Sequence, residues 1–453
     1  MQIVIVGAGT VGFDLAVQLQ KAGHDVGLVE RSEARCSEIS AKLDILVVEG
    51  HGSSPRALEQ AGIADAHMVL AVTSNDEVNI LVCGIAEQHG VATRIARVRN
   101  REFTRRKARV DLHRLGVTRV IDPEGVVVRV IDQIARIPDV VEAFGFHEGE
   151  ILVARHVMTP EMPIIGRTLI EILQMAGTER FLSVALRRGH EARIPVGDDV
   201  IQPGDDMTTL FHRDSLPKYL DLLGLSGRRV RKAVVAGDSL TAIQLCEVFE
   251  TWVDDVTLIS RNEAHAQRAA KRLREAEVIH GEPTERDILQ EVHVAGADLF
   301  VGCGLDTPQN VMSALLARAE GARRVVAMSL EPQSNELFRS IGVDHVISPR
   351  RAMTHAIFDL IHVGRGAVEL HLRDMELEAI ELTAADGSPI TRAPLAKTWQ
   401  AMRRHAIVGA IVRDGTMLIP RGDTRLDAGD EAIIIAEARA IPKLRKLFGE
   451  SRP

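Results

Sequence analysis

Three glycines near the start of the chain have the spacing of a loop that holds phosphate groups. They are Gly7, Gly9 and Gly12, in the order Gly-x-Gly-x-x-Gly. The apolar run Ile3 to Val6 precedes them and predicts a buried parallel strand, and the segment Val11 to Leu19 has the apolar periodicity of a helix. Phosphates at such a turn would meet the free N–H groups and the positive dipole end of the helix.

Each glycine has a separate task in this interpretation. Gly7 allows the tight turn, Gly9 lets a pyrophosphate approach the backbone, and Gly12 lets helix and strand pack closely. A second predicted strand, Val26 to Val29, ends on Glu30. Since 30 − 12 = 18, Glu30 lies near the spacing expected for an acid that accepts ribose hydroxyls. The alternative is an ordinary turn with a surface glutamate, but strand, glycines, helix and acid in the right order favour a nucleotide site.

Apolar runs and helical patterns alternate as far as a helix predicted from Pro123 to Ile137, and this order predicts a doubly wound parallel sheet. Ligands of such sheets bind beyond the carboxyl ends of the strands. The residues that close or follow the strands should therefore surround one crevice. These residues are Gly7, Ala8, Gly9, Thr10, Val11, Glu30, Gly50, His51, Thr73, Ser74 and Arg97, with Gly12 at the start of the helix.

Several of these side chains have a second interpretation. Thr73 and Ser74 could donate hydrogen bonds to ribose or phosphate, or belong to the N-cap of the following helix. Arg97 could contact a phosphate, whereas the basic residues that follow it, from Arg99 to Arg109, are typical of a solvated face. His51 is more typical of a hydrogen-bonded turn residue than of a ligand.

Composition limits the class of protein. The 453 residues allow about three or four compact units, and the net charge of −8 argues against a general nucleic-acid binder. No apolar stretch approaches the ~20 residues that cross a bilayer, and the N-terminus predicts a strand rather than a signal peptide. The four cysteines have no metal or redox spacing and are expected as small buried residues of a cytoplasmic protein.

The pattern changes after Ile137-Pro138-Asp139, a predicted hinge, and from Ile151 it becomes one of short strands and turns. Phe181 to Leu186 predicts one strand, Ile194-Pro195 the start of the next, and Leu216 to Leu223 a short helix. These segments predict a small α+β module.

The chain then repeats itself. Gly7 corresponds to Gly237 and Asp76 to Asp306, both with a shift of 230, and Gly204-Asp205 corresponds to Gly429-Asp430 with a shift of 225. A repeat of this length predicts an α/β protein made of two tandem copies, each a Rossmann-like lobe with a doubly wound parallel sheet followed by a small α+β lobe. The predicted lobes are residues 1–137, 138–224, 229–360 and 361–453, with a second hinge at Leu225 to Arg228.

The two copies differ in chemistry. In the second copy, serine and alanine replace two of the three glycines of the first copy. Other residue types replace its candidate ligand-binding residues. The predicted replacements are Ser239 for Gly9, Ala242 for Gly12, Ser260 for Glu30, Glu282 for His51, Cys303 for Thr73 and Met328 for Arg97. A side chain at Ser239 is expected to crowd a pyrophosphate. We therefore expect one nucleotide site for each chain, in the first lobe.

The most specific stretch, VVEGHGSSPRALEQAGIADAHMVLAVTSNDEVN from Val47 to Asn79, resembles the first-lobe pattern of the TrkA family. GAGTVG from Gly7 to Gly12, Glu30, and RIARVR from Arg94 to Arg99 also match this pattern. Members of this family are cytosolic regulatory subunits of bacterial Trk potassium uptake and contain two tandem RCK (regulator of potassium conductance) units. The resemblance covers nearly the whole chain, although GDSLTA stands where the second lobe often keeps a glycine-rich loop.

The resemblance implies that the first lobe binds NAD or NADH, or ATP or ADP at the same site, through Gly7 to Val11, Glu30, Thr73, Ser74 and Arg97. It also implies a homo-oligomeric ring, expected to be tetrameric, under a membrane-embedded Trk-type potassium channel or transporter subunit. The chain would then be cytoplasmic and peripheral on the inner face of the plasma membrane through this partner. No metal and no nucleic acid are implied.

Two other functions compete with this one. An NAD-dependent oxidoreductase would need an acid or base facing the nicotinamide, but the small lobes have no cluster of His, Lys or Tyr, and Tyr219 is the only tyrosine. The chain is therefore not expected to be an enzyme. An RCK-type regulator of another potassium channel or of a cation/proton antiporter stays open, although the duplication within one chain favours the Trk type.

Overall fold

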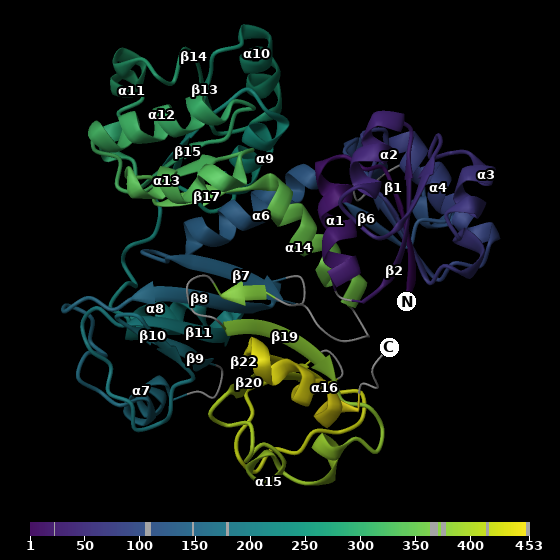
Figure 1. The fold of residues 1–453 in the computed structure, drawn as a ribbon. Coiled ribbons are helices and arrows are strands. Elements are labelled where there is room, and N and C mark those ends of the chain that lie inside the picture. Colours follow the sequence, from purple (N-terminus) through teal and green to yellow (C-terminus); the bar gives the residue numbers. More distant parts are fainter. Residues whose placement is uncertain are drawn as a thin grey trace.

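The structure is a computed structural model that describes residues 1–21, 23–104, 110–146, 149–177, 181–362, 370–372, 377–413 and 416–449. The basic run after Arg97 therefore lies partly outside the described residues. Two large lobes lie side by side, and two small lobes pack against each other below them in the view of Figure 1. The α/β class and the tandem order of lobes predicted from the sequence are confirmed, while the lobe boundaries stay predictions.

The first large lobe has a parallel six-stranded sheet with the order β3-β2-β1-β4-β5-β6. Alternate residues of β1 enter opposite cores: Ile3 and Ile5 on one face, Val4 and Val6 on the other. The strands are β1 (Gln2–Val6), β2 (Asp25–Glu30), β3 (Leu46–Glu49), β4 (Met68–Ala71), β5 (Thr93–Arg97) and β6 (Arg119–Ile121). The helices are α1 (Thr10–Lys21), α2 (Glu33–Ser40), α3 (Pro55–Gln60), α4 (Asp76–Gln88), α5 (Arg101–Thr104) and α6 (Pro123–Arg136).

The second large lobe repeats this sheet, with the parallel order β14-β13-β12-β15-β16-β17. Its strands are β12 (Lys232–Ala236), β13 (Asp255–Ser260), β14 (Glu277–His280), β15 (Leu299–Gly302), β16 (Val325–Met328) and β17 (His345–Ile347). Its helices are α9 (Leu240–Phe249), α10 (Glu263–Arg272), α11 (Arg286–Glu291), α12 (Thr307–Ala319), α13 (Asn335–Ser340) and α14 (Pro349–His362).

The two large lobes exchange their last helices. Val127 and Ile131 of α6 belong to the same core as Val235 and Leu245 of the second large lobe. Conversely, Ile357 of α14 is buried in the core of the first large lobe, against α1 and β1. Figure 1 shows α6 and α14 lying between the two lobes, and Arg350 of α14 forms an ion pair with Asp14 of α1. Each large lobe therefore depends on the other for one face of its sheet.

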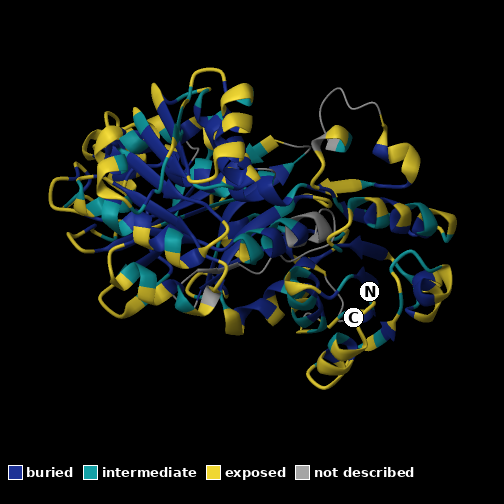
Figure 2. Ribbon diagram, turned by 90° about the horizontal axis from the view of Figure 1, so that it is seen from above, coloured by how far each residue is buried: buried dark blue, intermediate teal, exposed yellow. Residues whose placement is uncertain are grey.

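Each small lobe is built on an antiparallel sheet, with the orders β10-β9-β11-β8-β7 and β18-β19-β22-β20-β21. The first contains β7 (Glu142–Phe146), β8 (Ile151–Val157), β9 (Phe181–Arg188), β10 (Glu191–Arg193), β11 (Asp206–His212), α7 (Leu169–Ala176) and α8 (Leu216–Leu222). The second contains β18 (Leu370–Leu372), β19 (Leu377–Thr383), β20 (Ala406–Arg413), β21 (Thr416–Leu418), β22 (Glu431–Glu437), α15 (Leu395–Thr398) and α16 (Ile441–Phe448). Figure 2 shows the buried strands inside and the exposed residues on the outer helices and loops.

Two details of the small-lobe prediction were wrong. The strand pattern begins with β7, ahead of Ile151, and Ile194-Pro195 does not begin a strand but follows the end of β10 at Arg193. A proline has no N–H group to donate to a neighbouring strand, so this dipeptide ends the hairpin instead of extending it.

The repeat is confirmed, but after β13 the numbers of corresponding residues in the two large lobes differ by 231 and not by 230. The partner of Val6 in β4 is Ala71, and the partner of Ala236 in β15 is Gly302. Gly304, not Cys303, therefore stands at the position of Thr73. Likewise Asp306 is the N-cap of α12 as Asn75 is the N-cap of α4, so Asp306 does not correspond to Asp76. One residue more lies between β12 and β15 than between β1 and β4, which the constant shift missed.

A buried histidine beside the first predicted hinge should make stability depend on pH. His156 is 0% exposed, its Nε2 donates to Pro138 O (3.0 Å), and its Nδ1 accepts from the Tyr219 hydroxyl (3.0 Å). Burial lowers the pKa of His156 from 6.5 to about 4. Between these values the unfolded chain binds more protons than the folded chain, so stability is complete above pH 6.5 and falls as the pH drops toward 4.

We expect a loss of about 2 kcal/mol between pH 7 and pH 5 from this group alone. His156→Gln keeps a donor and an acceptor but does not titrate. Urea unfolding of both proteins at the two pH values measures the effect. An equal loss of unfolding free energy between pH 7 and pH 5 in both proteins would show that His156 is not responsible.

Candidate functional site

A cavity of about 290 Å³ lies beyond the carboxyl ends of β1, β2, β4 and β5, where the sequence predicts it. We call it the first crevice. All of the predicted residues except Ala8 and Gly12 line it. The lining residues are Val6, Gly7, Gly9, Thr10, Val11, Val29, Glu30, Arg31, Gly50, His51, Gly52, Val72, Thr73, Ser74, Asn75, Val78 and Arg97.

The three glycines occupy different environments. Gly7 has φ +101°, and a Cβ there would lie 3.0 Å from the backbone of Thr73. A Cβ at Gly12 would lie 1.9 Å from the Gly7 carbonyl oxygen, so Gly12 serves packing and not the cavity. A Cβ at Gly9 would meet nothing within 4 Å. The backbone at Gly9 is thus open to the crevice, as a loop that accepts phosphate requires.

Glu30 is held at the edge of this loop by backbone groups. Its Oε2 accepts from the Ala8 N–H at 2.8 Å, and its Oε1 accepts from the N–H groups of Arg31 (2.9 Å) and Ser32 (3.0 Å). Ala8 itself is buried and contributes only main-chain atoms; its carbonyl accepts from Arg35 Nε at 3.0 Å. The Glu30 carboxylate is therefore fixed in position before any ligand binds.

Asn79, on α4, organises the other wall and was missed in the sequence. Its Oδ1 accepts from the Thr73 N–H (3.0 Å) and hydroxyl (2.7 Å), and its Nδ2 donates to the carbonyl oxygens of Thr73 (3.1 Å) and Arg97 (2.8 Å). Its spacing six residues after Thr73 was the available signal. The N-cap of α4 is Asn75, whose Oδ1 accepts from Val78 N, so Ser74 does not cap the helix. Ser74 is exposed.

Arg97, the last residue of β5, places a cation in the crevice wall. Its Nη1 donates to Thr73 O at 3.0 Å, whereas its buried Nε has no hydrogen-bond partner among the described residues. Burial and the neighbouring Arg99 lower the pKa of the Arg97 guanidinium, and Glu124 and Asp76 act in the opposite direction. A guanidinium stays protonated in proteins. An unsatisfied buried donor of this kind is costly. Other parts of Arg97 are partly exposed and line the crevice, so its guanidinium could pair with an anionic group there.

His51 behaves as the turn residue expected from the sequence. Its Nδ1 lies 2.7 Å from Ser53 Oγ and accepts from the Ser53 N–H at 3.3 Å. The ring lines the crevice together with Arg31, a second cation beside Glu30 that the sequence analysis did not single out.

The equivalent cavity of the second large lobe is much smaller, about 70 Å³. Asp238 stands where the first lobe has Ala8. Its carboxylate accepts from Ser260 Oγ (2.6 Å) and Arg261 Nε (3.0 Å) at the place that Glu30 organises in the first lobe. Met328 replaces Arg97 as predicted, since Asn310 Nδ2 donates to its carbonyl at 2.9 Å as Asn79 does to that of Arg97.

The role predicted for Ser239, to crowd a pyrophosphate with its side chain, was wrong. Ser239 Oγ donates to Cys303 O at 2.6 Å and accepts from the Ala242 N–H at 3.2 Å. The hydroxyl therefore caps α9 and does not project into the cavity. The helix N-terminus is occupied by its own cap, and the anionic Asp238 adjoins it, so a phosphate would meet fewer free donors and an added negative charge.

Neither a metal site nor a membrane span was found within the described ranges. No group of three or more His, Cys, Asp or Glu side chains could hold an ion there. No helix in the described part of the chain combines the length and apolar character needed to cross a bilayer. All four cysteines are buried, as the sequence analysis expected.

Comparisons with known proteins agree with this architecture. Residues 3–123 and 233–349 each match the TrkA-N domain, and residues 380–449 match the TrkA-C domain. The chain is 30% identical over 457 residues to the Trk system potassium uptake protein TrkA of Azorhizobium caulinodans, covering 99% of this chain and 98% of that protein. It is 28% identical to the TrkA of Haemophilus influenzae, over 100% of this chain and 99% of that one.

Among solved structures, the GsuK RCK domain superposes with a TM-score of 0.61 at 17% identity, over 99% of this chain and 95% of that chain. The GsuK channel bound to NAD gives the same TM-score at 16% identity, over 99% of this chain and 79% of that chain. These likenesses show the tandem RCK fold. Because the TrkA-N match alone covers more than half of the chain and the sequence relatives match over their full length, this chain belongs to the TrkA family.

Proposed function

We propose that this chain is the nucleotide-responsive regulatory subunit of a Trk-type potassium uptake system. Its full-length relatives are named Trk system potassium uptake proteins, and the GsuK channel, whose chain has the same fold, was solved bound to NAD. The subunit does no chemistry on its nucleotide; occupancy of the first crevice changes the shape that a membrane partner senses. A ligand shifts such an equilibrium only through different affinities for the two shapes.

The proposed ligand is NAD or NADH, with ATP or ADP as further occupants of the same site. The backbone from Gly7 to Val11 and the α1 N-terminus would hold the phosphates, Glu30 the ribose hydroxyls, and Thr73, Ser74 and Arg97 the remaining polar groups. One observation carries this proposal: the partly exposed, cationic Arg97 lines a crevice whose Gly9 backbone is open. The second large lobe, which lacks both features, is proposed to bind no nucleotide.

The proposed partner is a membrane-embedded Trk-type potassium channel or transporter subunit. The chain would assemble beneath it as a homo-oligomer, most simply a tetrameric ring, on the cytoplasmic face of the membrane. The proposed boundaries of its four lobes are residues 1–137, 138–224, 229–360 and 361–453. Co-purification from membranes with mass spectrometry of the partner tests this. Recovery of a different potassium channel or of a cation/proton antiporter would contradict the Trk assignment.

Potassium flux through the reconstituted partner tests regulation directly. Flux is measured with the wild-type chain and with Gly9→Asp, each with and without NADH or ATP. A coupling of about 1–3 kcal/mol would change flux roughly 5–150-fold with nucleotide in the wild type alone. Identical flux in all four conditions, with the complex still assembled, would contradict the proposal. Steady turnover of NADH or ATP by the purified chain would instead favour an oxidoreductase or another enzyme.

Glu30 should make the site prefer NADH over its 2′-phosphorylated form. The carboxylate is held by three backbone N–H groups, so it cannot easily move away from a 2′-phosphate. Repulsion in this partly solvated position is expected to weaken NADPH binding about tenfold. Glu30→Gln removes the charge and keeps one of the two acceptor oxygens, so it should narrow the difference between the affinities for NADH and NADPH. Equal affinities for NADH and NADPH in the wild type, measured by calorimetry, would show that Glu30 does not face the ribose.

A further inference from the structure

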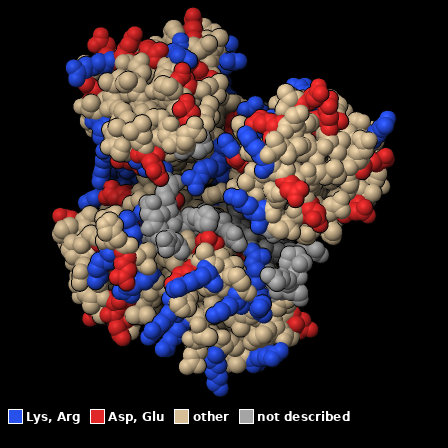
Figure 3. All heavy atoms as spheres, in the orientation of Figure 1, with Lys and Arg blue, Asp and Glu red and all other residues tan. Residues whose placement is uncertain are grey.

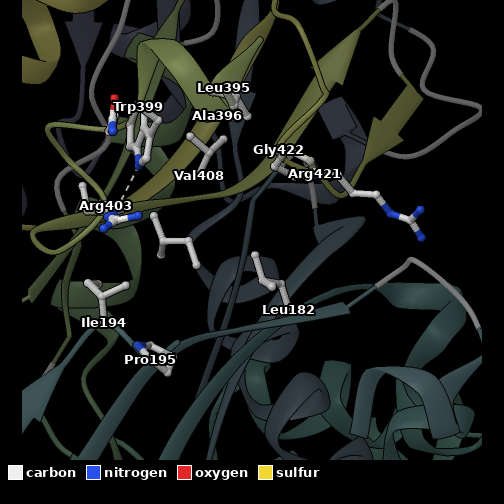
Figure 4. Close-up of a pocket in the computed structure, with 14 residues that line it drawn as sticks. Leu182, Ile194, Pro195, Leu395, Ala396, Trp399, Arg403, Val408, Arg421 and Gly422 are labelled. Carbon is white, nitrogen blue, oxygen red and sulfur yellow. Dashed lines mark hydrogen bonds between the residues drawn. The ribbon is translucent and has the colours of Figure 1, made fainter. Parts of the chain in front are cut away.

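Positive side chains are common on this protein, so charge alone does not identify a functional residue. Figure 3 shows lysine and arginine side chains spread over the visible face, with a gathering over the second small lobe. Arg403, which is exposed, and Trp399 both line a cavity of about 430 Å³ between the two small lobes (Figure 4). Arg35, on α2, is different because its guanidinium contacts the backbone of the glycine-rich loop, residues 7–12, beside the first crevice.

Arg35 connects this loop to two helices. Its Nε donates to the Ala8 carbonyl at 3.0 Å, its Nη1 donates to Glu38 further along α2, and its guanidinium carbon lies 5.0 Å from the centre of the Phe13 ring on α1. The side chain is partly exposed but does not line the first crevice. These contacts hold the guanidinium against the loop and outside the cavity.

The backbone of Ala8 is held on both of its sides. The Ala8 N–H donates to Glu30 Oε2 at 2.8 Å, and the Ala8 carbonyl accepts from Arg35. Glu30 ends β2 and Arg35 lies on the helix that follows, so one strand–helix unit fixes both groups. Ala8 is also buried, and the loop therefore has little freedom to turn at this residue.

The contact with Arg35 sets the direction of the Gly9 N–H. The Ala8 carbonyl and the Gly9 N–H belong to one planar trans peptide, in which the two bonds point in opposite directions. A carbonyl directed at Arg35, outside the cavity, therefore turns the Gly9 N–H to the other side, and Gly9 lines the crevice. Within the described part of the chain this N–H has no hydrogen-bond partner. A free N–H group just ahead of a helix is a donor that suits a phosphate oxygen.

We propose that Arg35 is a positioning residue for the phosphates of the nucleotide: it holds the Ala8–Gly9 peptide so that the Gly9 N–H faces them. This inference rests on the function proposed above and deepens it. Without the guanidinium the peptide can rotate, and rotation would bring the Ala8 carbonyl, with its partial negative charge, toward the phosphates. Loss of this preorganisation weakens ligands that carry phosphate, because the ribose would meet Glu30 and not this peptide.

Calorimetry of the full-length chain with ADP, and with adenosine, which lacks phosphate, tests this role. Arg35→Met keeps much of the apolar stem but loses the donor to Ala8. We expect it to bind ADP about tenfold more weakly than the wild type does, and adenosine equally well. Arg35→Gln is uncharged but keeps an N–H donor at the same number of bonds from the backbone as Nε. It should bind ADP within about twofold of the wild type.

Lys42→Met is the matched control for the loss of a positive charge. Lys42 also pairs with Glu38, at 2.8 Å, and its Nζ lies 6.0 Å from the centre of the Phe13 ring, but no hydrogen bond joins it to the described loop. The variant should bind both ligands as the wild type does. Amide exchange at residues 7–12 without ligand is a second measurement, and it should be faster in Arg35→Met than in the other three proteins.

Three results would overturn the role of Arg35. These are ADP affinity and amide exchange in Arg35→Met that equal those of the wild type, equal weakening of ADP binding by Arg35→Gln and Arg35→Met, and equal weakening of ADP and adenosine by Arg35→Met. The second result would assign the effect to charge, and the third to a general disturbance of the crevice. Absence of ADP binding by the wild type would instead contradict the nucleotide site itself, so the two failures are distinguishable.

Discussion

Replacing Gly9 by aspartate should abolish nucleotide binding by the whole chain. The position is open, with nothing within 4 Å of an added Cβ, so the substitution does not disturb the fold. It does place a carboxylate where the pyrophosphate would meet the backbone and the α1 N-terminus. Repulsion together with lost backbone contacts should weaken NADH binding at least about 100-fold, or about 3 kcal/mol. Calorimetry should give about one NADH for each wild-type chain and none for Gly9→Asp.

The matched control belongs in the second large lobe. Gly237 is unsuitable, because its φ is +155° and a Cβ there would lie 2.5 Å from Gly304 N. Leu305 is 72% exposed at the edge of the smaller cavity, so Leu305→Asp adds the same charge there without strain. The Leu305→Asp variant should bind NADH with the affinity and stoichiometry of the wild type. Two equal sites for each chain, or loss of binding through Leu305→Asp, would contradict a single site in the first lobe.

Local patterns in the sequence predicted most of the fold because each strand is a short apolar run that ends in a turn signal. The glycine spacing and Glu30 located the first crevice, and the repeat located its counterpart. These features depend on residues that are close in the chain or in register along one sheet. Their positions follow from the regular geometry of parallel strands.

The contacts that the sequence did not reveal are those between distant segments. The role of Asn79 depends on its side chain reaching the carbonyl of Arg97, 18 residues further along the chain, and the spacing from Thr73 alone does not indicate this contact. The sequence also does not predict the exchange of α6 and α14, because the pattern of an amphipathic helix indicates which face is buried but not which sheet covers it. Ser239 was misjudged because its side-chain direction depends on the cap that it forms.

The helix exchange gives a physical reason for keeping the second large lobe, which we propose to bind no nucleotide. Removal of that lobe would expose the apolar face of α6 and uncover the face of the first sheet that α14 packs against. The same exchange connects the first crevice to the second lobe. Arg99, two residues after Arg97, donates from Nε to Glu124 Oε1 at 3.0 Å in the first turn of α6. The other end of α6 is held by the second lobe.

Arg324, just ahead of β16, makes this second connection. It is 8% exposed; its Nη1 donates to Ile137 O (3.1 Å) and Ile134 O (3.2 Å), and its Nη2 donates to Ala135 O (2.9 Å). The Arg324 guanidinium donates to carbonyl groups that the helix leaves unpaired at the C-terminus of α6. Its positive charge also interacts favourably with the negative end of the helix dipole. The next residues form the predicted hinge, where Asp139 has φ 53° and its Oδ2 accepts from Arg228 Nη1 at 2.6 Å.

Arg324→Met should therefore separate nucleotide binding from its effect on the partner. Methionine keeps much of the apolar stem but leaves three carbonyls without their donor, which should cost about 3 kcal/mol of stability. We expect NADH to bind the variant as it binds the wild type, while the nucleotide-dependent change in potassium flux is lost and amide exchange at residues 134–139 becomes faster. Arg323→Met, at the exposed neighbouring position, should change neither the flux response to nucleotide nor the amide exchange at residues 134–139. An unchanged flux response in Arg324→Met, with the exchange rates raised, would mean that α6 does not carry the signal from the first crevice to the second lobe.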